Sequence, residues 1–129
     1  MFDGNIFKEK SFRNVVENNE TIGYEVETYI PYYRGIPLSM VSNVRVVADG
    51  VEVPRETIRF TVDQIDWFTL DEMQTVTFYK WEYNQAATIR VLQSGGLSKG
   101  EHEVTLNVVA RTAYIPIPLS GEKTQKVSV

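Results

Sequence analysis

Hydrophobic and polar residues alternate along much of the chain. In residues 22–30, Ile22, Tyr24 and Val26 share one face while charged residues take the other. Residues 101–112 show the longest run of this kind. A period of two is typical of a β-strand with one buried face. The same period predicts shorter strands at 11–16, 44–53, 58–62, 75–79, 87–92 and 123–129.

Turn signals separate these runs. Asp49-Gly50 lies between β-branched residues and is the pair that a type I′ hairpin turn requires. Residues 17–20 form the turn of a first hairpin, and residues 93–100 hold three glycines. Thr69-Leu70-Asp71-Glu72 has the spacing of a capping box, which predicts one short helical turn.

About eight strands with no longer helix predict an all-β protein, an antiparallel β-sandwich of the immunoglobulin-like or Greek-key type. Residues 1–129 are expected to form a single domain, because no linker, repeat or low-complexity tract divides them. The corner formed by Leu97, Gly100, His102 and Val104 before a long strand is similar to a turn of immunoglobulin-like sandwiches.

Two proline-rich segments interrupt the alternation. Tyr29–Met40 and Tyr114–Leu119 each pair Tyr-Ile-Pro with a later Pro-Leu, and their prolines predict an extended loop or sheet edge. We expect them to form neighbouring rims of one surface, which serves either the domain's own core or a partner. Tyrosine and arginine contribute strongly to protein interfaces. The candidate residues for a partner interface or site rim are Tyr29, Tyr32, Tyr33, Arg34, Pro37, Met40, Tyr114, Pro116 and Pro118.

Six aromatic residues lie between positions 67 and 83. They either close one end of the sandwich core or, if exposed, stack on sugar rings. The six are Trp67, Phe68, Phe78, Tyr79, Trp81 and Tyr83.

The composition of the chain limits the classes of partner that we expect. The 129 residues carry a net charge of −4 and no basic cluster, so nucleic acid is not an expected partner. No apolar run has the roughly 20 residues that a membrane helix needs. The N-terminus does not have the pattern of a signal peptide, and the chain has no cysteine. We therefore expect a cytoplasmic protein that does not bind a membrane.

Catalytic candidates are few. The single histidine, His102, is flanked by Glu101 and Glu103, whose side chains point the opposite way in a strand. An acidic cluster could in principle hold Ca²⁺ or act in acid–base catalysis, but its spacing favours a solvated loop. Its members are Asp63, Asp66, Asp71 and Glu72. The sequence thus predicts no catalytic residue, metal site or cofactor in this chain.

Nearly the whole chain resembles a known family, the small β subunits of bacterial C-glycoside deglycosidases. The most specific block is Tyr29-Ile30-Pro31-Tyr32-Tyr33-Arg34-Gly35. The other blocks are Met1-Phe2-Asp3, Ile6-Phe7-Lys8, Ser11-Phe12-Arg13-Asn14, Pro37-Leu38-Ser39, Val53-Pro54-Arg55, Arg59-Phe60-Thr61-Val62, Leu97-Ser98, Gly100-Glu101-His102-Glu103-Val104 and Tyr114-Ile115-Pro116-Ile117-Pro118-Leu119.

This resemblance implies a β-sandwich bound to a larger, catalytic α subunit with a TIM-barrel fold. The α subunit is expected to carry a divalent metal, Mn or Mg, and the catalytic histidine. The implied reaction is a lyase reaction of flavonoid C-glycoside metabolism, in which a 3-keto C-glycoside loses its aglycone by cleavage of a carbon–carbon bond. The present chain would be the non-catalytic subunit, and its two proline-rich segments would dock on the α subunit.

Two alternatives remain open from the sequence. The chain could be a stand-alone carbohydrate-binding sandwich that uses Trp67 and Trp81. It could also be a small enzyme that acts through His102 and Glu103.

Overall fold

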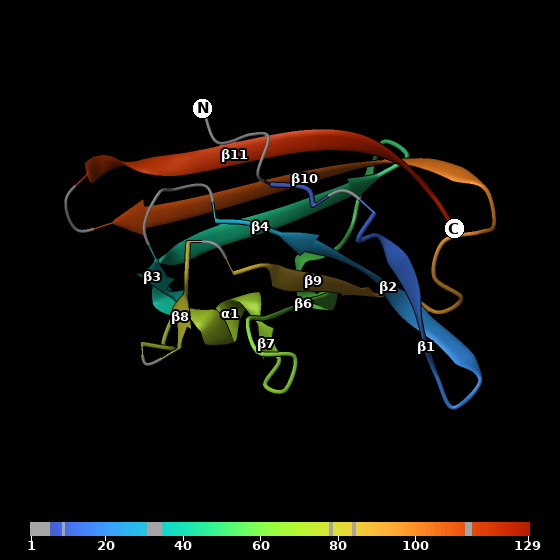
Figure 1. Ribbon diagram of the computed structural model, residues 1–129, viewed down its shortest axis with the longest axis horizontal. Helices are drawn as coiled ribbons and strands as arrows, with labels where there is room; N and C mark the ends of the chain where they lie inside the picture. The colour runs from blue at the N-terminus through green and yellow to red at the C-terminus, as the bar shows by residue number, and fades with distance from the viewer. Residues whose placement is uncertain (1–5, 9, 31–34, 78, 84, 113–114) are drawn as a thin grey trace.

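A computed structural model describes residues 6–8, 10–30, 35–77, 79–83, 85–112 and 115–129, with the side chains of all these except 112 and 115–118. Two β-sheets pack face to face (Figure 1). The five-stranded sheet has the order β1-β2-β9-β6-β7, and the four-stranded sheet has the order β11-β10-β4-β5. A short ribbon, β3-β8, completes the described strands.

The strand bounds follow the predicted runs closely in most places. They are β1 Arg13–Glu17, β2 Glu20–Thr28, β3 Ile36–Pro37, β4 Val41–Ala48, β5 Val51–Glu52, β6 Ile58–Thr61, β7 Phe68–Thr69, β8 Lys80–Trp81, β9 Ala87–Leu92, β10 Glu101–Thr112 and β11 Ile115–Ser128. One helix, α1 Leu70–Met73, and two 3₁₀ turns, Leu38–Met40 and Arg55–Thr57, lie between them.

The strand order confirms the predicted sandwich class. An immunoglobulin constant-type fold pairs its strands as ABED in one sheet and CFG in the other. Here β1-β2-β9-β6 corresponds to ABED, and β4-β10-β11 corresponds to CFG. All of the described pairings are antiparallel.

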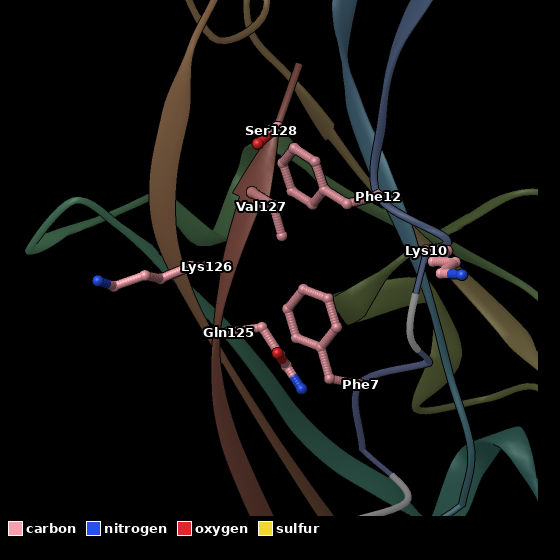
Figure 2. Close-up of a pocket in the computed structure, with 7 residues that line it drawn as sticks. All are labelled: Phe7, Lys10, Phe12, Gln125, Lys126, Val127 and Ser128. Atoms are coloured by element: carbon pink, nitrogen blue, oxygen red, sulfur yellow. The ribbon is translucent and has the colours of Figure 1, made fainter.

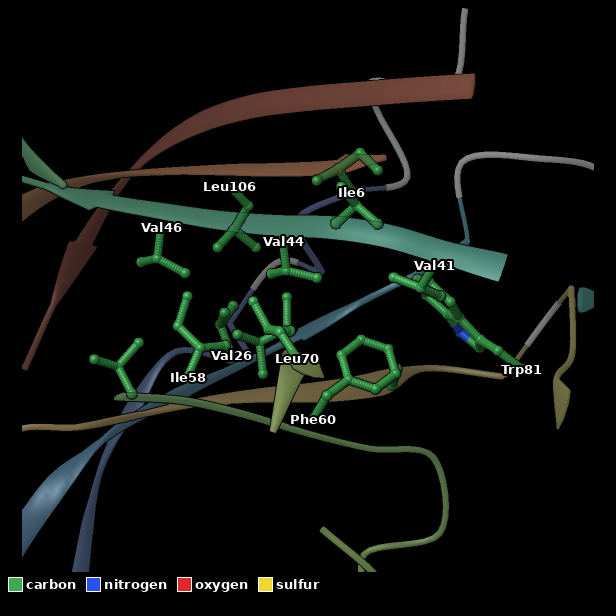
Figure 3. Packing of buried hydrophobic residues seen from close by; sticks show 14 of the residues in the cluster. Ile6, Val26, Val41, Val44, Val46, Ile58, Phe60, Leu70, Trp81 and Leu106 are labelled. Carbon is green, nitrogen blue, oxygen red and sulfur yellow. The ribbon is translucent and has the colours of Figure 1, made fainter. Parts of the chain in front are cut away.

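The core lies between the inner faces of the two sheets (Figure 3). Phe60 and Val26 come from the five-stranded sheet, and Val44 and Leu106 come from the four-stranded sheet. All four side chains are almost completely buried. Their removal from water supplies the main driving force for packing the sheets together.

The local turn predictions are confirmed. Asp49 and Gly50 have φ values of 50° and 81°, as a type I′ turn between β4 and β5 requires. Asn18 and Asn19 form the turn of the first hairpin with φ values of 50° and 65°. At α1 the Glu72 N–H donates to the Thr69 hydroxyl at 3.1 Å, and the Glu72 carboxylate accepts from the Thr69 N–H at 2.7 Å.

The outer face of β2 is less solvated than alternation predicts. Glu25 is only 6% exposed although it lies on that face. Arg13 of β1 and Arg90 of β9 hold its carboxylate from both sides, at 2.7 Å and 2.9 Å. The two arginines compensate for the free-energy cost of removing the Glu25 carboxylate from water.

The prediction of a strand at 75–79 is wrong for the residues described. Thr75 and Val76 continue the turn after α1, because their N–H groups donate to Glu72 and Met73. Only Lys80–Trp81 forms a strand there.

The last strand is longer than predicted, since β11 begins at Ile115 rather than near residue 123. It is an edge strand, as expected for a segment with prolines. Val129 and Gly100 exchange both backbone hydrogen bonds, and the register runs unbroken to Leu119 opposite Ala110. By alternation, Pro118 therefore turns the nitrogen that lacks an N–H away from β10.

Among the described residues, no helix has the length and apolar character needed to cross a membrane.

Candidate functional site

The described part of the Tyr29–Met40 segment rests on the hydrophobic core. Ile30, Ile36 and Leu38 are at most 4% exposed, while Tyr29, Pro37 and Met40 are half-buried. Tyr32, Tyr33 and Arg34 lie outside the described residues. Aliphatic side chains therefore anchor the segment on both sides of the predicted Tyr-Tyr-Arg block.

A short ribbon holds the same segment from the other side. In β3 and β8, Ile36 pairs with Trp81 and Pro37 pairs with Lys80. The backbone N–H of Leu38 then donates to the Tyr79 carbonyl at 3.0 Å. The sequence did not predict this pairing, because it joins residues more than 40 positions apart and neither strand is longer than two residues.

Trp81 is the anchor of the ribbon. Its side chain is fully buried, its ring packs edge-on against Phe60 at 5.3 Å, and its Nε1–H donates to the Gln85 carbonyl at 2.9 Å. Gly35 lies close against the same ribbon. A β-carbon at position 35 would lie 3.1 Å from the Trp81 carbonyl oxygen and 2.8 Å from the Glu82 carboxylate.

The two proline-rich segments reach the same end of the four-stranded sheet. Ala110 of β10 pairs with Val41 on one side and with Leu119 on the other. Figure 1 shows β3, β8 and this end of β10 close together. We call this region the β3 end, defined by residues 36–40, 79–81 and 119.

The remaining candidates of the second segment are only partly described. Pro116 and Pro118 lie in β11, although their side chains are not described, and Tyr114 lies outside the described residues. A role for the β3 end in binding a partner stays a prediction.

The aromatic residues of 67–83 mostly serve the fold. Phe68 and Tyr79 pack edge to face at 5.5 Å, and the Tyr79 hydroxyl donates to the Asp66 carboxylate. That hydrogen bond raises the pKa of Tyr79. The Arg90 guanidinium lies 4.1 Å from the centre of the Trp67 ring.

These contacts weaken the sugar-binding alternative. A sugar needs an exposed ring face, but Trp81 is fully buried and Arg90 covers one face of Trp67. Tyr83 is 48% exposed, and Phe78 lies outside the described residues. The interpretation of this segment as core-closing is confirmed for Trp81.

Both ring nitrogens of His102 are occupied. Nε2 donates to the Ser98 carbonyl at 2.7 Å, and Nδ1 donates to the Asp49 carboxylate at 2.6 Å. The bond to Asp49, and then the bond to Ser98, raise the pKa of His102. The same ion pair lowers the pKa of Asp49. His102 therefore ties the β4–β5 turn to the loop before β10.

The acidic cluster is dispersed among separate partners. Asp63 accepts the backbone N–H groups of Ile65 and Asp66, both at 2.9 Å, and these bonds lower its pKa. Asp71 forms an ion pair with Arg55 at 3.0 Å, while Glu72 caps α1. Within the described part of the chain, no three carboxylate or histidine side chains group as metal ligands.

Comparison with known proteins gives the chain's family. The family model described as C-glycoside deglycosidase beta subunit matches residues 2–114. The chain belongs to this family. The match confirms the resemblance found in the sequence and covers all of the strands from β1 to β10.

Individual relatives agree with the family match. The C-glycoside deglycosidase beta subunit of Eubacterium cellulosolvens is 27% identical over 112 residues, which cover 86% of this chain and 76% of the relative. The 3′-dehydrocarminate deglycosidase beta subunit of a Microbacterium species is 33% identical over 100 residues, which cover 75% of this chain and 74% of the relative. The C-glycoside deglycosidase beta subunit of Microbacterium trichothecenolyticum is 33% identical over 94 residues, which cover 70% of this chain and 66% of the relative.

Proposed function

We propose that this chain is the non-catalytic beta subunit of a heteromeric C-glycoside deglycosidase in the cytoplasm. The observation that supports a non-catalytic role is that His102 has both ring nitrogens engaged in hydrogen bonds. It is the only histidine in the chain, and histidine is the side chain best suited to move protons near neutral pH. Both of its nitrogens already hold structural hydrogen bonds.

In this proposal the chemistry belongs to a catalytic alpha subunit with a TIM-barrel fold. The substrate is a 3-keto C-glycoside, whose ketone makes the proton on the neighbouring carbon acidic. A base removes that proton, and the resulting enolate expels the aglycone from C1 by elimination. The electron pair of the broken carbon–carbon bond leaves with the aglycone carbon, which takes up a proton. A divalent Mn or Mg ion and a histidine of the alpha subunit would stabilise the enolate and take the proton.

The beta subunit would dock through the β3 end together with the Tyr32–Arg34 block. Support comes from the way in which the described residues are fixed there. The β3-β8 pairing and the buried Ile36 and Trp81 fix the described residues 36 and 37 against the domain before a partner arrives. A rigid surface loses less conformational entropy on binding than a mobile one.

Co-expression with the protein encoded beside it tests this function. The mass of the co-purified species is measured, and cleavage of a 3-keto C-glycoside is assayed with each component alone and with both together. We expect a mixed complex that is active only as a complex. Full activity of the isolated chain, or a monomer that ignores its neighbour, would contradict the proposal.

A further inference from the structure

A cavity of about 360 Å³ lies at the side of the sandwich where β1 and β11 are the edge strands of the two sheets (Figure 2). One wall is the N-terminal segment before β1, and the other is the end of β11. The lining residues are Phe7, Lys10, Phe12, Gln125, Lys126, Val127 and Ser128. This volume is in the range of pockets that bind small molecules.

The N-terminal wall is built in place by hydrogen bonds. The Lys8 N–H donates to the Glu27 carbonyl at 3.0 Å, and the Glu27 N–H donates to the Ser11 hydroxyl at 3.0 Å. Phe7 is 4% exposed, and the Phe12 ring packs against the buried Tyr24 ring at 5.3 Å. Two aromatic rings are thus held beside the cavity.

The β11 wall supplies one apolar and one amide side chain. Val127 and Gln125 share a face of the strand because they are two residues apart. Figure 2 shows the Gln125 side chain directed toward Phe7, with Lys126 pointing away from both phenyl rings. Val127 is 9% exposed.

Among the described residues that line the cavity, the two charged side chains, Lys10 and Lys126, are both positive. No lining residue is a carboxylate, and Lys10 forms no ion pair within the described chain. Two carboxylates of β2 on the N-terminal side are already engaged, since Glu27 pairs with Lys8 and Arg13, and Glu25 pairs with Arg13 and Arg90. A negatively charged ligand would therefore meet an unpaired cation.

We propose that this cavity binds a flat aromatic molecule that carries a carboxylate. Its ring would pack on the half-buried Phe12 and on the small exposed parts of Phe7 and Val127, while its carboxylate would accept from the amide N–H of Gln125 and pair with the charge of Lys10. Aromatic rings flanked by a few polar groups are the usual composition of such a pocket. The proposal does not depend on the deglycosidase function, because it concerns this chain by itself.

The first test titrates 2-naphthoate into the full chain and follows backbone amide shifts by NMR. We expect saturable shifts concentrated at Phe7, Phe12 and Gln125–Ser128. The substitution Val127→Phe, which fills the cavity, should weaken binding at least about tenfold while the chain keeps its NMR fold pattern. Absence of saturation, shifts centred elsewhere, or unchanged binding by the variant would overturn the proposal.

A matched pair of variants tests the charge. Lys10→Gln and Lys126→Gln each remove one positive charge, but only Lys10 is assigned to the ligand. Lys10→Gln should weaken 2-naphthoate binding by up to about fivefold and leave neutral 2-naphthol unaffected, which is the upper range for an ion pair of an exposed lysine. Lys126→Gln should change both by less than about twofold. Equal losses in both variants would overturn the assignment of Lys10.

Discussion

His102 shows at the scale of one residue how a histidine can serve the fold rather than catalysis. Its two hydrogen bonds go to a carboxylate and a carbonyl oxygen, so both ring nitrogens must carry protons. That environment favours the imidazolium and raises the pKa of His102 above its usual value of about 6.5.

The first prediction follows from this shift. Because the pKa of His102 is raised on folding, its stabilising effect is complete below pH about 6.5 and disappears as pH rises through the folded-state pKa. Asp49 has a lowered pKa, so its effect is lost only in acid, as pH falls through its own folded-state pKa. The stability advantage of the wild-type chain over His102→Gln should therefore shrink between pH 6 and pH 9.

Urea unfolding across this pH range measures that advantage, and an NMR titration of the imidazole gives the pKa directly. An imidazole pKa at or below the value of an unfolded peptide would contradict the prediction.

The second prediction concerns Tyr33 and Arg34. If they are interface hot spots, changing both to Ala should weaken binding of the alpha subunit by more than about 1 kcal/mol. Titration calorimetry measures the affinity. Arg45→Ala provides the control, since Arg45 pairs with Glu52 on the outer face of the four-stranded sheet and should leave binding unchanged. Equal affinity of the double variant and the wild type would remove these residues from the interface.

At the scale of elements, the β3-β8 ribbon depends on Trp81. The change Trp81→Leu removes part of a fully buried side chain and its hydrogen bond to Gln85. We expect a loss of about 2–4 kcal/mol in the free energy of unfolding. Tyr83→Leu, at a position that is 48% exposed, should change it by less than about 0.5 kcal/mol. Urea denaturation compares the two variants, and similar losses in both would contradict the assigned role of Trp81.

The elements that the sequence predicts well are those specified locally. Asp49-Gly50 needs only its own backbone preference to form a turn, and Thr69 and Glu72 cap α1 over three residues. The β3-β8 pairing, in contrast, depends on contacts between distant segments, and so does the burial of Glu25 between two arginines. No local pattern encodes such contacts.

The candidate site follows the same division. Prolines and tyrosines marked Tyr29–Met40 as unusual, and the structure anchors its described part through Ile36 and Leu38. No local pattern in the sequence indicates the cavity beside Phe7, because its two walls come from opposite ends of the chain. Only the arrangement of the sheets brings them together.

At the scale of the whole molecule, the β3 end and the cavity lie near opposite ends of β10. Its Ala110 lies at the β3 end, whereas His102 pairs with Val127 beside the cavity. A partner at the β3 end and a small ligand at the cavity would therefore occupy opposite ends of the same strand. Substitutions in one region should therefore leave binding at the other region unchanged.

The fourth prediction concerns the edge of the molecule. Lys123 of β11 pairs with Leu106, whose side chain points into the sandwich, so Lys123 faces the same inner side. A charge directed inward on an edge strand discourages further strand pairing. Lys123→Val should leave the fold intact but cause association at high protein concentration. Light scattering of concentrated samples measures this, with Lys126→Val on the opposite face as the control.

Monomeric behaviour in both variants would show that Lys123 does not protect the edge.

The outer edge of β11 also affects whether the subunit associates with other chains before it binds a partner. Alternate residues from Ser120 to Ser128 direct their backbone N–H and C=O groups away from β10, so a newly made chain offers a template for other extended chains. A subunit produced in excess must therefore keep itself in solution. If Lys123→Val associates as predicted, the inward-facing Lys123 of β11 is what protects this edge in the interval between synthesis and assembly.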